Sequence, residues 1–247
     1  MNNDTKINIF AIRSFRDVAD NDYISARLSY RYHLMPQFHW QSLQSLEKYF
    51  KAIFLLNRVK AKKIKHSLET ALEKLHELPF SVELSKVSNE FINHIATHGQ
   101  FRYLETSWDI SGPKLVELDF AVWELRRYCQ ILNYNAEVEG VSVNMLNSEI
   151  QKIKESKDAP ASKFRIEGGE LEKIIDNFNH PSRPALIWQN AFFCKKVRKK
   201  LKNVKTPFYA VNSPLSMHPE ILDEVVKYVY MPDYLIKAYK EYYGNKN

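Results

Sequence analysis

The spacing of apolar residues between positions 38 and 57 restricts the fold more than any other feature of this sequence. Leu43, Leu46, Phe50 and Ile53 recur at steps of three and four residues, and aromatic neighbours widen the apolar stripe. Residues with this spacing lie on one face of an α-helix. The pattern therefore predicts a long amphipathic helix over residues 38–57, whose apolar face has to pack against other elements.

Other segments of the first half repeat this pattern over shorter lengths. We expect helices over residues 23–34, 67–78, 87–98 and 114–132. Asp22 and Ser67 are suited to cap two of them, and Gly99 is placed to end another in a left-handed conformation. Residues 7–12 are expected to form a short strand. Five helices with short connections predict an all-α fold, an antiparallel helical bundle.

The apolar periodicity weakens after residue 133. Residues 135–144 are expected to be extended, and residues 156–162 have the composition of a linker. Beyond the linker we expect helices near residues 170–178, 185–203 and 219–243. The prediction is therefore a bundle over residues 1–145 and a C-terminal helical extension over residues 146–247.

Several classes of protein are excluded by what the sequence lacks. Its 6 glycines form no GxGxxG or GxxxxGK pattern, so neither a Rossmann turn nor a P-loop is predicted. No apolar run is long enough to span a membrane, and no secretory signal is visible. Cys129 and Cys194 form no CxxC pair, which suits a reducing cytoplasm and excludes a Cys-rich zinc module. We expect a cytoplasmic protein without a cofactor.

The positive charge of the chain is concentrated in one segment. Residues 1–140 carry 18 Lys and Arg against 17 Asp and Glu, whereas residues 141–247 carry 18 against 12. Residues 195–205 hold seven basic side chains and no acidic one, which equals the formal net charge of +7. The seven are Lys195, Lys196, Arg198, Lys199, Lys200, Lys202 and Lys205. A local basic patch of this kind favours a phosphate backbone, with a membrane surface or a solvated helix as the alternatives.

The first half resembles the HEPN family of helical domains. The likeness lies in residues 22–27 (DYISAR), 38–52 (FHWQSLQSLEKYFKA) and 65–68 (KHSL), in this order, and more loosely in residues 102–103 and 122–129. It covers about residues 15–135. The resemblance implies a bundle that commonly dimerises and works on RNA, either as a metal-independent ribonuclease or as a domain that binds without cleaving.

One motif separates the ribonucleases from the other members of that family. The resemblance implies that a ribonuclease carries an Arg followed four to six residues later by a His on a late helix. No His follows Arg126 or Arg127 within residues 128–134. The one pair in the sequence with this spacing is Arg27 and His33, on the first long predicted helix, where six residues separate the side chains by about 120°.

The remaining candidates have both a functional and a structural interpretation. His66 could transfer a proton, or it could belong to a structural turn before the Ser67 cap. Arg126 and Arg127 could hold a phosphate bidentately, or they could be paired with nearby carboxylates. Glu90, His94 and His98 share one helical face but lack a partner from a second helix, so no metal site is predicted.

Together these features predict an intracellular HEPN-like protein that binds RNA or nucleotides as a homodimer without a catalytic Arg/His pair of its own. The predicted contacts to nucleic acid come from the basic segment, Arg126 and Arg127. Two alternatives stay open. One is a metal-independent HEPN ribonuclease, a toxin or defence effector that uses Arg27 and His33 or residues brought together from distant positions. The other is a protein-interaction scaffold.

Overall fold

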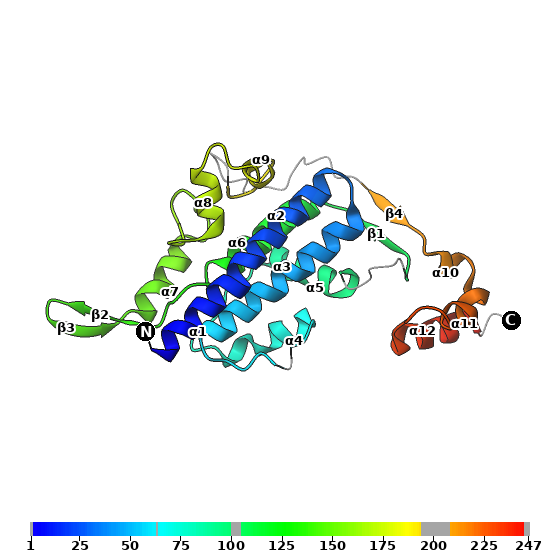
Figure 1. The fold of residues 1–247 in the computed structure, drawn as a ribbon, viewed down its shortest axis with the longest axis horizontal. Coiled ribbons are helices and arrows are strands. Elements are labelled where there is room, and N and C mark those ends of the chain that lie inside the picture. The colour runs from blue at the N-terminus through cyan, green and yellow to red at the C-terminus, as the bar shows by residue number, and fades with distance from the viewer. Residues whose placement is uncertain (1, 63, 100–104, 194–207, 245–247) are drawn as a thin grey trace. The chain divides into compact units, whose positions relative to one another are not determined.

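The computed structural model describes residues 2–62, 64–99, 105–193 and 208–244. Most of these residues are helical, as predicted, but two small two-stranded sheets mean that the fold is not purely α (Figure 1). The chain divides into two compact units. Unit 1 comprises residues 1–100 and 113–205, and unit 2 comprises residues 101–112 and 206–247. This division does not follow the predicted boundary at residue 145.

Unit 1 begins with a helical rod. Helix α1 (Asn3–Ala11) continues through a π-helical turn (Ile12–Arg16) into α2 (Asp17–Arg31), and α3 (Met35–Leu56) runs beside them (Figure 1). The strand predicted at residues 7–12 is therefore wrong: Asn2 caps a helix there by accepting a hydrogen bond from the Thr5 backbone at 2.8 Å. Asp22 is no cap either, because it lies inside α2 and pairs with Lys48 at 2.6 Å.

Helix α3 forms the centre of the core, as its periodicity predicted. Leu46, Phe50 and Ile53 are completely buried, and α2, α5 and α6 pack around the helix. Ser67 caps α4 (Leu68–Glu73) by accepting from Thr70, and a 3₁₀ turn (Lys74–Glu77) follows. Helix α5 (Lys86–His98) packs on α6 (Lys114–Arg126). Gly99 ends α5 with φ of −68°, so the left-handed cap predicted there is wrong.

The rest of unit 1 is built from short elements. A hairpin of β2 (Asn135–Val138) and β3 (Val141–Asn144) confirms the extended segment, with Val138 paired to Val141 next to the turn. Helices α7 (Leu146–Glu155), α8 (Glu170–Asp176) and α9 (Arg183–Ile187) follow. The long helix predicted from residue 185 ends at Ile187, and residues 188–193 are not helical. The remainder of that predicted helix, residues 194–203, lies outside the described residues.

Unit 2 has a small core of its own. Strand β1 (Trp108–Ile110) pairs antiparallel with β4 (Tyr209–Val211). They are followed by α10 (Pro214–Met217), a 3₁₀ turn (Pro219–Ile221), α11 (Leu222–Val225) and α12 (Asp233–Gly244). The single helix predicted over residues 219–243 is thus interrupted between Val225 and Asp233. The buried cluster consists of Leu215, Leu222, Met231, Leu235 and Tyr239.

Candidate functional site

Arg126, a predicted phosphate ligand, lies instead inside the protein. Its side chain is 2% exposed. It donates to both carboxylate oxygens of Asp20 at 2.7 and 2.8 Å, and to both of Glu172 at 2.8 and 2.7 Å. Burial disfavours the charge, but the two carboxylates outweigh it and raise the pKa of Arg126. This guanidinium is engaged by protein carboxylates, so we correct its predicted role to a structural one.

Arg127, the second predicted phosphate ligand, is also buried. Its guanidinium donates to the Trp123 and Ile153 carbonyls at 3.2 and 2.6 Å and to the Ser156 hydroxyl at 3.2 Å. Burial lowers the pKa of Arg127. The side chain therefore satisfies the Ile153 carbonyl near the end of α7 and joins that helix to α6, which again corrects the prediction of a phosphate contact.

The Arg27/His33 spacing does not give a catalytic pair within the described chain. Arg27 is buried, forms an ion pair with Asp119, and donates to the Ala185 carbonyl at 3.1 Å. Asp119 also accepts from Tyr23 at 2.7 Å and from the Ala191 backbone at 2.9 Å. His33 is exposed beyond the end of α2, with φ of 60°. Arg27 thus joins α2, α6 and the segment after α9.

His66 lies in the turn before the Ser67 cap, as the structural interpretation predicted. Its side chain is 75% exposed, and Nδ1 lies 3.0 Å from a carboxylate oxygen of the buried Glu47. Glu47 also pairs with Lys51. A catalytic role for His66 stays a prediction.

The helical face that carries His94 and His98 has a partner on a second helix that the sequence did not reveal. This partner is His39, and the three histidines form a cluster. His39 on α3 meets His94 of α5 with Nε2 atoms 3.0 Å apart, and the His94 and His98 rings are 4.7 Å apart. His39 Nδ1 donates to the Met35 carbonyl at 3.0 Å. Burial lowers the pKa of His39 to about 4 and that of His94 to about 3. Within the described ranges, no group of three or more side chains is arranged to hold a metal ion.

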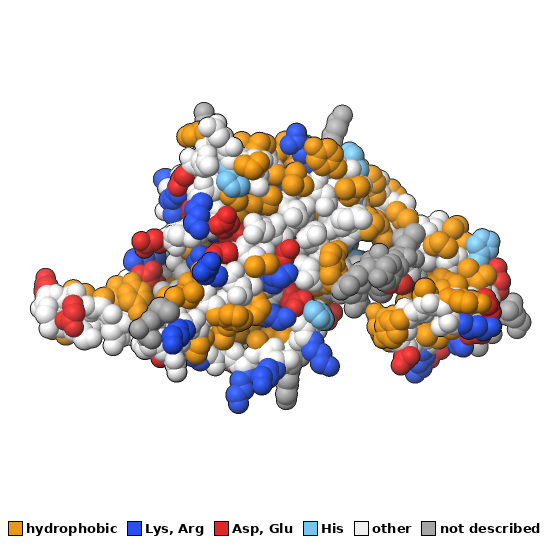
Figure 2. Space-filling model, in the orientation of Figure 1, with side chains coloured by type: hydrophobic (Ala, Val, Ile, Leu, Met, Phe, Trp, Pro, Cys, Tyr) orange, Lys and Arg blue, Asp and Glu red, His pale blue; other side chains and the backbone are white. Residues whose placement is uncertain are grey.

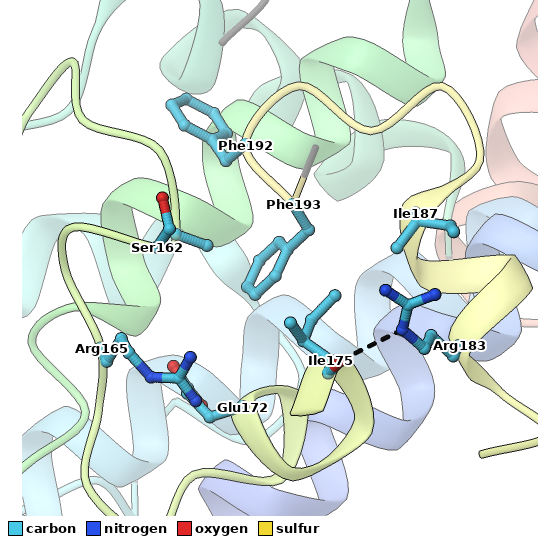
Figure 3. Close-up of a pocket in the computed structure, with 9 residues that line it drawn as sticks. Ser162, Arg165, Glu172, Ile175, Arg183, Ile187, Phe192 and Phe193 are labelled. Atoms are coloured by element: carbon cyan, nitrogen blue, oxygen red, sulfur yellow. Dashed lines mark hydrogen bonds between the residues drawn. The ribbon is translucent and has the colours of Figure 1, made fainter. Parts of the chain in front are cut away.

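A pocket in unit 1 brings together residues that the sequence did not single out. It has a volume of about 710 Å³ and lies between the segment after α7, helices α8 and α9, and the segment that follows α9 (Figure 3). Its lining is made of Ala161, Ser162, Arg165, Glu172, Ile175, Arg183, Ile187, Phe192 and Phe193. Small-molecule sites have this range of volume and this mixture of apolar walls with few polar groups.

The polar side chains of the pocket differ in the hydrogen bonds and ion pairs that they already make within the protein. Both carboxylate oxygens of Glu172 accept from Arg126, and one also accepts from the Ile166 backbone at 3.1 Å. Arg165 pairs with Asp176 at 2.5 Å in an exposed contact. Arg183 donates through Nε to the Ile175 carbonyl at 3.0 Å (Figure 3). Its guanidinium lies 4.5 Å from the centre of the Phe178 ring. No carboxylate of the described chain pairs with Arg183.

Buried polar contacts attach the walls of this pocket to the bundle. Asn190 donates to the Tyr23 hydroxyl at 2.8 Å and accepts from the backbones of Phe192 and Phe193, both at 2.9 Å. Phe192 stacks on Trp123 of α6 with ring centres 4.8 Å apart. Two arginines that the sequence singled out, Arg126 as a phosphate ligand and Arg27 as half of a catalytic pair, thus position the segments that line the pocket, because Arg126 holds Glu172 and Arg27 holds Ala185.

The predicted basic segment lies outside the described residues. This applies to Lys195, Lys196, Arg198, Lys199, Lys200, Lys202 and Lys205, and also to Cys194. On the face drawn in Figure 2, Lys and Arg side chains stand among Asp and Glu side chains near α7 and α8. Among the helices that are described, none is both long and apolar enough to cross a membrane.

No family model, no curated protein and no solved structure matches the chain.

Proposed function

We propose that this protein binds RNA or nucleotides as a homodimer and does not cleave RNA with an Arg/His pair of its own. The proposal depends on one observation, the pocket of about 710 Å³. Apolar and aromatic side chains line it together with the guanidinium-bearing Arg183. Apolar walls suit a base or a sugar, and a guanidinium without a carboxylate partner suits a phosphate. The HEPN resemblance of residues 15–135 supports the same class of ligand.

The charge of the chain gives independent support. The seven basic side chains of residues 195–205 equal the net charge of +7. A cluster of this density attracts polyanions, and its contacts with RNA phosphates would weaken steeply as salt displaces them.

The ribonuclease alternative has weaker support. A phosphodiester-cleaving pair needs an arginine that can reach the substrate, whereas Arg27 and Arg126 are buried in ion pairs. The alternative was motivated by the spacing of Arg27 and His33. The buried ion pair with Asp119 gives Arg27 a structural role instead.

Binding to labelled RNA over a salt series, with and without EDTA, tests the proposed function. We expect salt-sensitive retention of intact RNA. Cleavage that persists in EDTA would favour the ribonuclease, and the absence of both retention and cleavage would favour the scaffold. Replacing Lys196, Arg198, Lys199 and Lys200 by Gln should flatten the salt dependence. The matched control replaces four exposed lysines elsewhere, Lys86, Lys227, Lys237 and Lys240, and should leave it unchanged.

An apolar surface on α2 supports the homodimer. Leu28 and Tyr32 lie one helical turn apart and are 37% and 67% exposed. We expect wild-type protein to have the mass of a dimer in light scattering, and the double replacement of Leu28 and Tyr32 by Ser to give the mass of a monomer. A dimer that survives this replacement would move the interface elsewhere.

A further inference from the structure

The guanidinium of Arg183 is held in place without being neutralised. Its Nε donates to a main-chain carbonyl, and its plane lies near the face of Phe178. Within the described part of the chain, its two terminal nitrogens make no recorded hydrogen bond. Arg126 in the same unit is, by contrast, saturated by two carboxylates. Arg183 therefore presents its two Nη donors, the edge that binds two oxygens of a phosphate or carboxylate.

A second arginine borders the same cavity. Arg165 is half-exposed, and its Asp176 partner is more exposed still, at 42% and 60% of their side-chain surfaces. Exposed ion pairs contribute little to stability, so an incoming dianion can compete with Asp176 for this guanidinium. Ser162 adds a hydroxyl at the same rim (Figure 3).

The opposite part of the cavity is apolar and partly aromatic. Ile175 and Ile187 come from α8 and α9, and Phe193 lines the same cavity from the segment after α9 (Figure 3). Phe192 stacks on Trp123, and Phe193 meets the same Trp123 ring edge-on at 6.0 Å, so this wall is backed by the core. Phe192 and Phe193 are 3% and 6% exposed, so they offer a small and rigid aromatic surface, against which a planar ring can pack.

We propose that this pocket binds a phosphate monoester that carries a planar base, with the phosphate on Arg183, the base against Phe193, and Arg165 as a second positive charge on the same cavity. The proposal rests on the proposed function. It narrows the ligand to a nucleotide with a terminal phosphate monoester, which can come from two sources. One source is a free mononucleotide, and the other is the terminal nucleotide of an RNA strand. A terminal monoester carries up to two negative charges and is attracted more strongly to a cavity with two arginines than an internal diester, which carries one.

Calorimetric titration of the full-length protein tests this assignment. The probes are UMP, AMP, the matching nucleosides, inorganic phosphate, and one short RNA with either a 5′-phosphate or a 5′-hydroxyl. We expect each mononucleotide to bind at least about tenfold more tightly than its nucleoside or inorganic phosphate. The nucleoside lacks the contacts of the phosphate, and inorganic phosphate lacks those of the base. If the natural source is an RNA end, the strand with a 5′-phosphate will bind more tightly than the same strand with a 5′-hydroxyl. If the source is a free nucleotide, it will not.

Arg183→Gln should weaken mononucleotide binding by at least about tenfold, and Arg183→Lys should recover part of the loss through its charge. Arg13→Gln, an exposed arginine on the first helical rod, is the matched control and should bind like wild type. Melting temperatures identify any variant that has failed to fold, in which case Arg165→Gln carries the same test with a smaller expected loss.

Equal binding of nucleotide and nucleoside, or wild-type affinity in folded Arg183→Gln, would overturn the assignment. This failure is distinguishable from failure of the proposed function. If RNA is still retained in a salt-sensitive way while no mononucleotide binds, the pocket assignment alone is wrong. If neither RNA nor nucleotide binds, both are wrong.

Discussion

Unit 1 and unit 2 differ most in what they bury. Unit 1 encloses large aromatic side chains together with charged ones, including Arg27, Asp119 and Arg126. The buried cluster of unit 2 has five members, all hydrophobic, while Tyr228 and Tyr230 next to it are 78% and 87% exposed. Because local stability follows the buried contacts of each region, we expect unit 1 to resist unfolding more strongly than unit 2.

The comparison also separates two uses of arginine. A buried arginine that faces carboxylates from distant parts of the chain fixes those parts to each other, as Arg126 does between Asp20 and Glu172. An arginine that pairs with no carboxylate of the described residues, such as Arg183, leaves donors for the external anion that we propose. Unit 1 contains both kinds, and the first kind builds the surroundings of the second.

The largest expected effect comes from removing the buried charge of Arg126 in unit 1. Arg126→Met would leave Asp20 and Glu172 buried without their counterion, which should lower the free energy of unfolding by about 3–5 kcal/mol. Urea unfolding followed by circular dichroism measures the loss, with Arg13→Met as the exposed control. A loss below about 1 kcal/mol would show that the network does not stabilise unit 1.

Truncating the core of unit 2 should have a smaller and local effect. Leu222 is 4% exposed, and Leu222→Ala should cost unit 2 about 2–3 kcal/mol. Hydrogen exchange should then accelerate in α12 and stay unchanged in α3. The exposed Val229 provides the control, since Val229→Ala should change neither region. Acceleration in α3 would mean that the two units unfold together.

The histidine cluster makes the stability of unit 1 depend on pH. The pKa values of His39 and His94 are lowered by burial to about 4 and about 3, below the 6.5 of the unfolded chain. As the pH falls from 6.5 toward 4, the unfolded chain takes up protons that the folded chain does not, so folding loses free energy. We expect a loss of about 2 kcal/mol between pH 6.5 and 5, after allowing for the partial exposure of His94.

Urea unfolding at several pH values checks this dependence. Replacing His39 and His94 by Gln should flatten the profile over that range, whatever its effect on stability at neutral pH. The exposed His76→Gln is the control and should keep the wild-type slope. An unaltered slope in the double variant would assign the pH dependence to other groups.

The smallest expected effect concerns one hydrogen bond of the buried network. Tyr49 donates to Asp20 at 2.7 Å, and Tyr49→Phe removes this bond while Arg126 continues to pair with Asp20. We expect a loss of about 1 kcal/mol in the free energy of unfolding. A loss as large as that of Arg126→Met would mean that the hydroxyl, rather than the arginine, keeps Asp20 stable inside the protein.

Local features of the fold were predictable from the sequence. The periodicity of residues 38–57 predicted α3, Ser67 predicted the start of α4, and residues 135–144 were correctly expected to be extended. Predictions from local patterns were wrong where another local feature, such as a helix cap or a proline, determined the structure. Residues 7–12 look like a strand, yet the Asn2 cap and the uninterrupted connection to α2 make them helical. Pro232, next to the start of α12, accompanies the break in the last predicted helix.

The candidate pocket was not predictable, because its polar contacts join residues far apart in the chain. A sequence shows that position 126 is positively charged, but not that its carboxylate partners lie 106 and 46 residues away. The same limit hid the meeting of His39 with His94, 55 residues apart. Arg183 carried no local signal, since it stands alone between two prolines.

A crystal structure of the protein grown with a mononucleotide is the most direct test of the central claim, that the pocket beside α8 and α9 holds a nucleotide. The account predicts a phosphate within hydrogen-bonding distance of both Nη atoms of Arg183, and a base in contact with Phe193. A nucleotide bound elsewhere, or an empty pocket at saturating nucleotide, would contradict it.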